Sequence, residues 1–434
     1  MKYEILSRSI FVFTLIFASF QGNAQEDILN SLNDTVTINR SENATQAPTT
    51  MEHKWNHIQN KYFTLNFGMA FLLDHNIVDQ DADNITQVGK VEPGTEFRGE
   101  RLLASGSLLF FKKNPWRYMF SANWNGLDAP PGKKRLEFID WNFDIPISPT
   151  AGWITVGKQK EGVGPEYVAP GTQGLFMERG TGAPMFIRQR NIGIRYSNSI
   201  LKGRMTYTLG VFNNYWETGK SFADNGTQIT ARVTGLLQYA SDRELIHVGM
   251  GYRHTAPTDG KLSYKAKPEV NTAPFYISSG SFEASGAGTI MLEGLWVKGP
   301  VTFIGEYMNT GVRSASQGNP HFTYFQAAGG WFITGENRRY NKQTGNLGKL
   351  IPKKNFKFRK GSGPGAIEIA SRFTHTDGTD AGISGGNYNR FTIAASWFVN
   401  PHFRYEINYG HGKFDKNDLI GKINIWQFRA QFEL

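Results

Sequence analysis

The side chains at the C-terminal end of the chain alternate strictly between apolar and polar. In the segment IWQFRAQFEL, the apolar set is Trp426, Phe428, Phe432 and Leu434. The polar set is Gln427, Arg429 and Glu433. Successive side chains of a β-strand point to opposite faces of the sheet. This segment therefore predicts a strand with one face toward an apolar environment and the other toward water. Few folds place the last strand of a chain between two such environments.

The same alternation recurs along the chain, in short segments separated by Gly, Asn, Asp and Pro. RYMFSANWNG (117–126) would place Tyr118, Phe120 and Trp124 on the apolar face, and FRYEINYG (403–410) alternates in the same way. A soluble β-sandwich also alternates, but its apolar face is the inner one, covered by a second sheet. Trp and Tyr near the strand ends are typical of the aromatic girdles of membrane barrels. The pattern favours a barrel with lipid outside and a watery lumen inside.

Long and short connections alternate between these predicted strands. Tight turns are predicted at 112–115, 148–150, 299–300 and 400–401, and long gaps at 74–95 and 161–187. Short turns on one side and long loops on the other describe a transmembrane antiparallel β-barrel, here of about 16 strands. That number requires 255–286, including KLSYKAKPEV, to be one long outer loop. Residues 334–363 break the rule, because this connection of about 30 residues falls on the short-turn side.

The first 24 residues have the features of a cleaved signal peptide. Lys2 and Arg8 precede the apolar run SIFVFTLIFASF (9–20), and Gly22-Asn23-Ala24 supplies small residues at the cleavage site. Residues 25–60 are polar and predict a flexible periplasmic lead-in, so the barrel is expected over 61–434. No later run is apolar and long enough for a membrane-spanning helix, which leaves a closed barrel as the way across.

Several motifs, in order, resemble one family. ITVGKQKEGVGPEYV (154–168), FMERG (176–180), FQAAGGWFITGENRRY (325–340), GAIEIASRFTHTD (365–377) and RFTIAASWFVNPHFRYEINYGHGKFD (390–415) are similar to segments of the phosphate-selective porin O and P family. The resemblance implies a 16-stranded homotrimeric porin of the Gram-negative outer membrane. It also implies a basic pore that favours anions such as phosphate or polyphosphate, with membrane lipid and lipopolysaccharide as neighbours.

The period of two assigns a set of arginines to the lumen, where they could pass anions by successive weak binding. These pore-lining candidates are Arg117, Arg195, Arg204, Arg232, Arg253, Arg372, Arg390, Arg404 and Arg429. The alternative is that they pair with inward carboxylates and brace the wall. The resemblance also implies that the third outer loop, 161–187, folds inward as a constriction. The constriction candidates are Arg179 within this loop and Lys158 and Lys160 at its entrance.

Two other basic stretches could act as funnels or as solvated charge runs. They are Lys133, Lys134 and Arg135 in the second outer loop, and KKNFKFRK (353–360) in the long inner connection.

Other chemistry finds little support in the sequence. There is no cysteine, so disulfides and thiolate metal sites are excluded. HKWNH (53–57) has helical spacing but no third ligand, and DQDADN (79–84) begins like a calcium loop without its glycine or its glutamate. We predict no catalytic residues, no metal, no cofactor and no nucleic-acid partner, despite the net charge of +10. The expected function is passive, anion-preferring diffusion; the alternative is a plugged barrel serving as an adhesin or structural protein.

Overall fold

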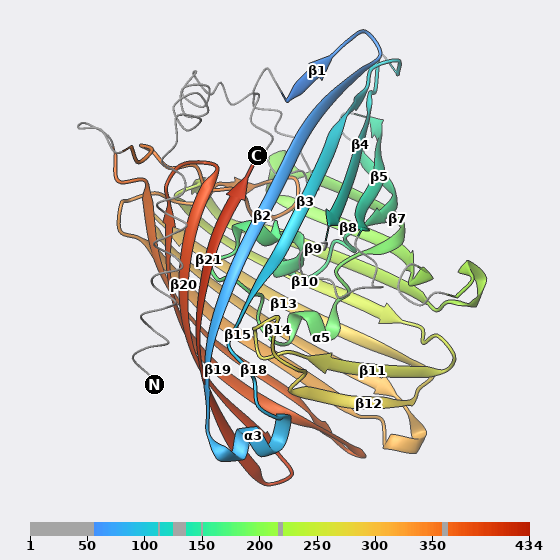
Figure 1. The fold of residues 1–434 in the computed structure, drawn as a ribbon. Helices are drawn as coiled ribbons and strands as arrows, with labels where there is room; N and C mark the ends of the chain where they lie inside the picture. Colours follow the sequence, from blue (N-terminus) through green and yellow to red (C-terminus); the bar gives the residue numbers. More distant parts are fainter. Residues whose placement is uncertain (1–55, 112, 125–135, 149–150, 216–219, 358–362) are drawn as a thin grey trace. The chain divides into compact units, whose positions relative to one another are not determined.

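Sixteen antiparallel strands close into a barrel (Figure 1). The structure is a computed structural model that describes residues 56–111, 113–124, 136–148, 151–215, 220–357 and 363–434. The predicted signal peptide and residues 25–55 of the lead-in lie outside these residues. The main sheet has 17 strands, of which the short β1 (His57–Gln59) only extends β2 as a hairpin, leaving 17 − 1 = 16 in the wall. The barrel closes where β21 pairs with β2.

The strands of the wall, in chain order, are β2 (Phe63–Gln80), β3 (Gly94–Leu108), β4 (Trp116–Trp124), β5 (Leu136–Ser148), β6 (Gly152–Gln159), β7 (Asn191–Ile200), β8 (Met205–Asn213), β9 (Thr227–Ser241), β10 (Glu244–Thr255), β13 (Gly286–Lys298), β14 (Val301–Arg313), β15 (His321–Phe332), β18 (Ala366–Asp380), β19 (Ile383–Phe398), β20 (Phe403–Lys416) and β21 (Leu419–Glu433). Each pairs with its neighbour in this order, so the predicted fold class and strand number are confirmed. Among the described residues, no helix is long and apolar enough to cross a membrane.

The alternation at the C-terminus is confirmed by the exposure of its side chains. Trp426 is 45% exposed on the outside, whereas Gln427 and Arg429 are each 2% exposed. The first strand is longer than the sequence analysis predicts, because the polar run after Leu73 continues the strand. Asp74 and Asn76 point inward and are buried, and Asp74 pairs with Arg429 on β21. Polar residues that suggested a loop are lumen-facing residues of β2.

The connections at one end of the barrel, here the outer end, are long, and most of those at the inner end are tight. The outer connection between β2 and β3 contains the helix α3 (Ala82–Val88). The expected long loop 255–286 lies between β10 and β13 and forms its own hairpin of β11 (Lys261–Ala266) and β12 (Ile277–Glu283). One connection at the inner end is long, as the sequence analysis predicts for residues 334–363. Residues 333–365 join β15 to β18 and include the small hairpin of β16 (Tyr340–Asn341) and β17 (Asn346–Leu347).

Three of these connections enter the lumen. They are the constriction loop (residues 160–190, between β6 and β7), the 256–285 loop, and the inner connection (residues 333–365). The constriction loop contains α4 (Pro165–Val168), η1 (Gly171–Gln173) and α5 (Ala183–Phe186). Buried apolar side chains of the first two loops, such as Val163, Phe186 and Tyr264, pack against inward-facing Met308 and Tyr324. The expectation of a watery lumen therefore needs correction, because part of it is filled by an apolar core.

Candidate functional site

Eight of the nine arginines predicted to line the lumen lie on strands of the barrel wall. Seven of them are buried, with exposed fractions of 5% or less, and Arg117 is partly buried. Arg204 is different: it is exposed in the turn before β8 and donates to the carbonyl oxygen of Leu236. Its placement on a lumen-facing strand position was wrong, because the strand begins one residue later.

Most of the buried arginines form ion pairs with carboxylates. Arg232 lies 2.6 Å from Glu293, and Arg253 lies 2.6 Å from Glu161. The remaining pairs are Arg117–Asp144, Arg372–Glu269, Arg390–Glu269, Arg404–Glu406 and Arg429–Asp74. Arg195 instead donates to the carbonyl oxygen of Lys160. Charges buried in a protein need such partners. The arrangement is the bracing alternative, in which arginines and acids hold one another, rather than a track of uncompensated charge.

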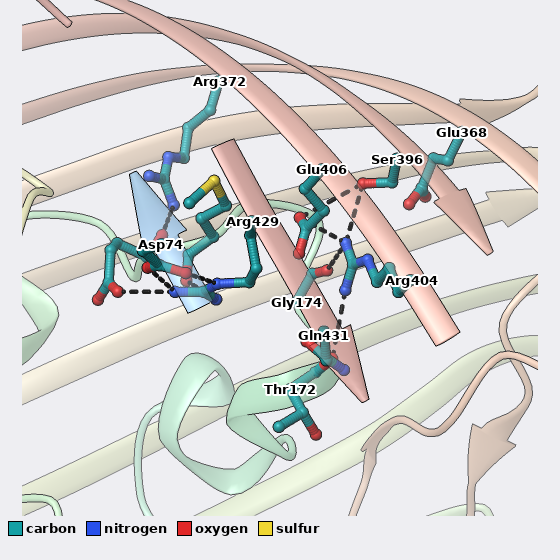
Figure 2. A network of polar contacts seen from close by, with 12 residues as sticks. Asp74, Thr172, Gly174, Glu368, Arg372, Ser396, Arg404, Glu406, Arg429 and Gln431 are labelled. Atoms are coloured by element: carbon teal, nitrogen blue, oxygen red, sulfur yellow. Dashed lines mark hydrogen bonds and ion pairs between the residues drawn. The ribbon is translucent and has the colours of Figure 1, made fainter. Parts of the chain in front are cut away.

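Two of these arginines also fasten the constriction loop to the wall (Figure 2). Arg404 donates to the carbonyl oxygens of Gly174 at 2.9 Å and Thr172 at 3.3 Å. Arg429 donates to the carbonyl oxygen of Met177 at 2.7 Å and to the carboxylate of Glu178 at 3.1 Å. Hydrogen bonds from a charged donor are stronger than neutral ones. The tip of the loop is thereby held against β20 and β21 inside the barrel.

Glu178 is the acidic anchor of this tip. It lies 2.7 Å from Arg98 as well as 3.1 Å from Arg429. Burial alone would raise the pKa of Glu178, but the two guanidinium groups outweigh burial and lower it to about 2. The carboxylate is therefore ionised at any physiological pH, and the tether does not titrate there.

The other two segments are anchored in the same way. Glu269, from the 256–285 loop, accepts from Arg372 at 2.5 Å and from Thr374 at 2.7 Å. In the inner connection, the carbonyl oxygens of Thr344 and Gly345 accept from Arg232 at 2.7 and 2.8 Å. Buried Arg338 of the same connection pairs with Glu368 on β18.

A cavity of about 840 Å³ remains between the three segments and the barrel wall, which β3, β5 and β6 line together with β13, β14 and β15. All three predicted constriction residues, Lys158, Lys160 and Arg179, line it, together with Arg101 and Arg190, which the sequence analysis missed. We refer to these five side chains as the cationic wall. The structure thus brings the predicted loop residues together and leaves the predicted strand arginines mostly in ion pairs.

The side chains of the cationic wall are only partly neutralised. Arg190 pairs with Asp140 at 2.9 Å, and the Lys158 ammonium donates to the carbonyl oxygen of Phe138. The Lys160 ammonium donates to the carbonyl oxygen of Ala169 at 2.8 Å. Burial, together with nearby Arg190 and Arg179, holds the pKa of Lys160 well below its usual range.

The remaining two members have no carboxylate partner within the described part of the chain. Arg179 donates to the carbonyl oxygen of Glu166, and its guanidinium lies 4.4 Å from the ring centre of Tyr167. The buried Nε of Arg101 has no hydrogen-bond partner among the residues that the structure describes.

A β-bulge explains why Arg101 was missed. Leu72 pairs with Gly99 but Leu73 pairs with Phe97, so Arg98 is an extra residue in β3. An extra residue reverses which side chains face inward. Glu96 before the bulge, Arg98 at the bulge and Arg101 after it all line the cavity. A strict period of two cannot describe this strand.

The weaker sequence alternatives have structural explanations. Asp81 caps helix α3 by accepting from the backbone N–H of Asn84 at 2.8 Å, which accounts for the acidic start of DQDADN. His57 contacts Asn66 across the β1–β2 hairpin, and His53 lies outside the described residues. Of the two basic stretches, residues 133–135 and Arg359 and Lys360 also lie outside the described residues. Lys353, Lys354 and Lys357 are exposed. Within the described ranges, no group of three or more His, Asp or Glu residues could hold a metal ion.

Comparison with known proteins decides the family. The profile of the phosphate-selective porin O and P family matches residues 73–434. The chain belongs to this family. The barrel and its loops agree with this membership and with a location in the outer membrane of Gram-negative bacteria. The chain is also 24% identical, over 279 residues and 60% of its length, to an uncharacterized protein of Caulobacter vibrioides, and spans about half (54%) of that relative.

Solved outer-membrane proteins share the fold at low identity. The anion-selective porin from Comamonas acidovorans is 12% identical with a TM-score of 0.55, over 86% of this chain and 100% of that one. OmpT of Vibrio cholerae is 11% identical with a TM-score of 0.54, over 87% and 99%. The channel DcaP of Acinetobacter baumannii is 13% identical with a TM-score of 0.52, over 87% and 99%. At these identities the likeness concerns the barrel, and the choice of solute depends on this chain's own residues.

Proposed function

We propose that this porin is a passive channel for small hydrophilic solutes that prefers anions, including phosphate and polyphosphate-like anions, and that it has no catalytic activity. The cationic wall carries the proposal. None of the ion pairs among the described residues involves Arg101, Lys160 or Arg179, although all three line the cavity. Uncompensated positive charge in a narrow, low-dielectric passage attracts anions and repels cations.

The family and the neighbouring structures support this preference. The family is described as phosphate-selective, and the similar porin from Comamonas acidovorans is described as anion-selective. The paired arginines contribute indirectly, because they hold the loop that carries Arg179 next to the wall. The proposed partners are therefore the anionic solutes, and around the barrel the outer-membrane lipid and lipopolysaccharide. A homotrimer is proposed as the assembly, as one structure of OmpT from Vibrio cholerae is a trimer form.

A second candidate is a closed barrel that serves as an adhesin or a structural protein. It is favoured by the three segments that enter the lumen and by the apolar core that they build there. Ionic conductance separates the two candidates, because a closed barrel passes no current.

The test is a titration of inorganic phosphate into a chloride current through the purified protein in a planar bilayer. Phosphate should reduce the current, and Arg101→Gln should raise the half-blocking concentration about threefold to tenfold, the value of one ordinary hydrogen bond. Arg117→Gln is the matched control, because Arg117 pairs with Asp144 and does not line the cavity. An equal effect of both substitutions, or a block that neither changes, would contradict the assignment of selectivity to the cationic wall.

A further inference from the structure

The cavity that holds the cationic wall has an apolar wall as well. This second wall consists of Leu295 on β13, Ile304 on β14, Ala328 on β15, Leu347 of the inner connection and Leu175 of the constriction loop. All five are lining residues of the same cavity as Arg101, Lys160 and Arg179.

Apolar side chains at inward positions are unusual for a porin, whose lumen is normally polar. Two apolar clusters account for them here. Leu175 and Phe176 pack against Ala328, Ala370 and Ala394, where small residues on the wall leave room for the loop. On the inner side, Leu295 belongs to a cluster with Leu245, Val297 and Tyr340. Ile304 is only partly buried and packs against both clusters, so its surface remains available to the cavity.

The two walls together define the shape and chemistry of a ligand. We infer that the cavity binds organic anions, with a carboxylate or sulfonate at Arg101, Lys160 and Arg179 and an apolar body against Leu295, Ile304 and Leu347, more tightly than inorganic phosphate. The inference rests on the proposed anion preference and specifies its solute class. Fixed polar groups that orient a ligand beside an apolar surface are the usual composition of small-molecule sites.

The volume and the charges of the cavity agree with this class. About 840 Å³ is within the range of pockets for organic molecules of moderate size and far more than an inorganic phosphate fills. Three of the five glutamates that line it are in ion pairs: Glu178 with Arg98, Glu293 with Arg232, and Glu166 with Arg372. Of the other two, Glu96 accepts from Asn271 and Glu137 is exposed. Phosphate at neutral pH is a strongly hydrated mixture of singly and doubly charged forms, and it gains nothing from the apolar wall. An organic anion gains there, because its apolar body leaves water.

The test is a series of carboxylates with equal charge and increasing apolar length, from acetate through butanoate to hexanoate, each used to block a chloride current at neutral pH. Burial of a methylene strengthens binding about fourfold when it is complete, and about twofold when it is partial. Hexanoate should therefore block at a concentration at least about tenfold below that of acetate, with inorganic phosphate closer to acetate. A protein-free bilayer with the same additions controls for partition into the lipid.

Two variants locate the apolar contact. Ile304→Thr should reduce the difference between hexanoate and acetate by about threefold or more. Val297→Thr is the control, because Val297 belongs to the adjacent apolar cluster but does not line the cavity, and it should keep the full difference.

The outcomes separate the inference from the proposal on which it rests. An anion-selective channel that hexanoate, acetate and phosphate block equally would overturn the organic-anion site and leave the anion preference standing. A channel without anion selectivity would overturn both. The comparison of acetate with hexanoate uses the unaltered protein, so it remains decisive even if Ile304→Thr does not fold.

Discussion

The tether between Arg404 and the constriction loop makes a quantitative prediction. Arg404 lies 2.7 Å from Glu406, and the side chains are 4% and 1% exposed. In Arg404→Met, the Glu406 carboxylate would remain buried without its partner, which costs about 3–5 kcal/mol of unfolding free energy. The variant also loses the charged hydrogen bonds to Thr172 and Gly174 in the loop. If water replaces them in part, the loop loses about 2 kcal/mol of anchoring, which raises the population of the released loop about thirtyfold.

Two assays measure these effects. Denaturant unfolding followed by tryptophan fluorescence should show the loss of stability, and the double variant Arg404→Met/Glu406→Gln should lose less than the sum of its single variants. Single-channel recordings of Arg404→Met should show added transitions to a higher conductance, because the loop tip leaves the lumen. Lys298→Met is the control, since Lys298 forms an exposed pair with Glu244 and should change stability by less than about 0.5 kcal/mol. Wild-type conductance and stability in Arg404→Met would refute the tether.

Three further predictions concern the same lumen. The pKa of Glu178 is lowered from 4.5 to about 2, so its ionised carboxylate stabilises the folded protein by about 3 kcal/mol. This contribution is complete above pH 4.5 and is lost as the pH falls toward 2. The free energy of unfolding of Glu178→Gln should lack this acid dependence. Because burial and the neighbouring arginines lower the pKa of Lys160, its ammonium loses its charge at a lower pH than an ordinary lysine does. The zero-current potential should therefore show an anion preference that falls as the pH rises, and this fall should be absent in Lys160→Met. Arg232→Met should free the inner connection at Thr344 and Gly345, which would appear as a larger and noisier single-channel conductance.

The strand pattern could be predicted because each side chain of a regular strand faces either lipid or lumen. Trp426 and Gln427 lie on the predicted faces, and so do Arg404 and Phe120. The rule fails where the strand is irregular. The bulge at Arg98 reversed the alternation and concealed Arg101; the adjacent Gly99 is the sequence signal of the bulge, and a strict period of two ignores it.

The site was less predictable than the fold, because it depends on contacts between distant segments. Glu178 meets Arg429 from 251 positions away, and Glu269 meets Arg372 from 103 positions away. The sequence shows that such charges face inward, but not which of them pair. For the same reason the sequence left open whether the strand arginines form an anion track or pair with acids. In the structure most of them pair, and Arg101, Lys160 and Arg179 are the lumen cations outside the ion pairs of the described residues. The inner connection was visible as an anomaly of length, but its entry into the lumen was not.

The most direct test of the anion preference is the zero-current potential of the purified protein in a planar bilayer between two concentrations of potassium chloride. The cationic wall predicts a measurable current and a potential of the sign set by chloride, with a smaller potential in Arg101→Gln. A potential of the sign set by potassium, or one near zero that Arg101→Gln leaves unchanged, would contradict an anion-preferring pore. The absence of any current would instead support a closed barrel.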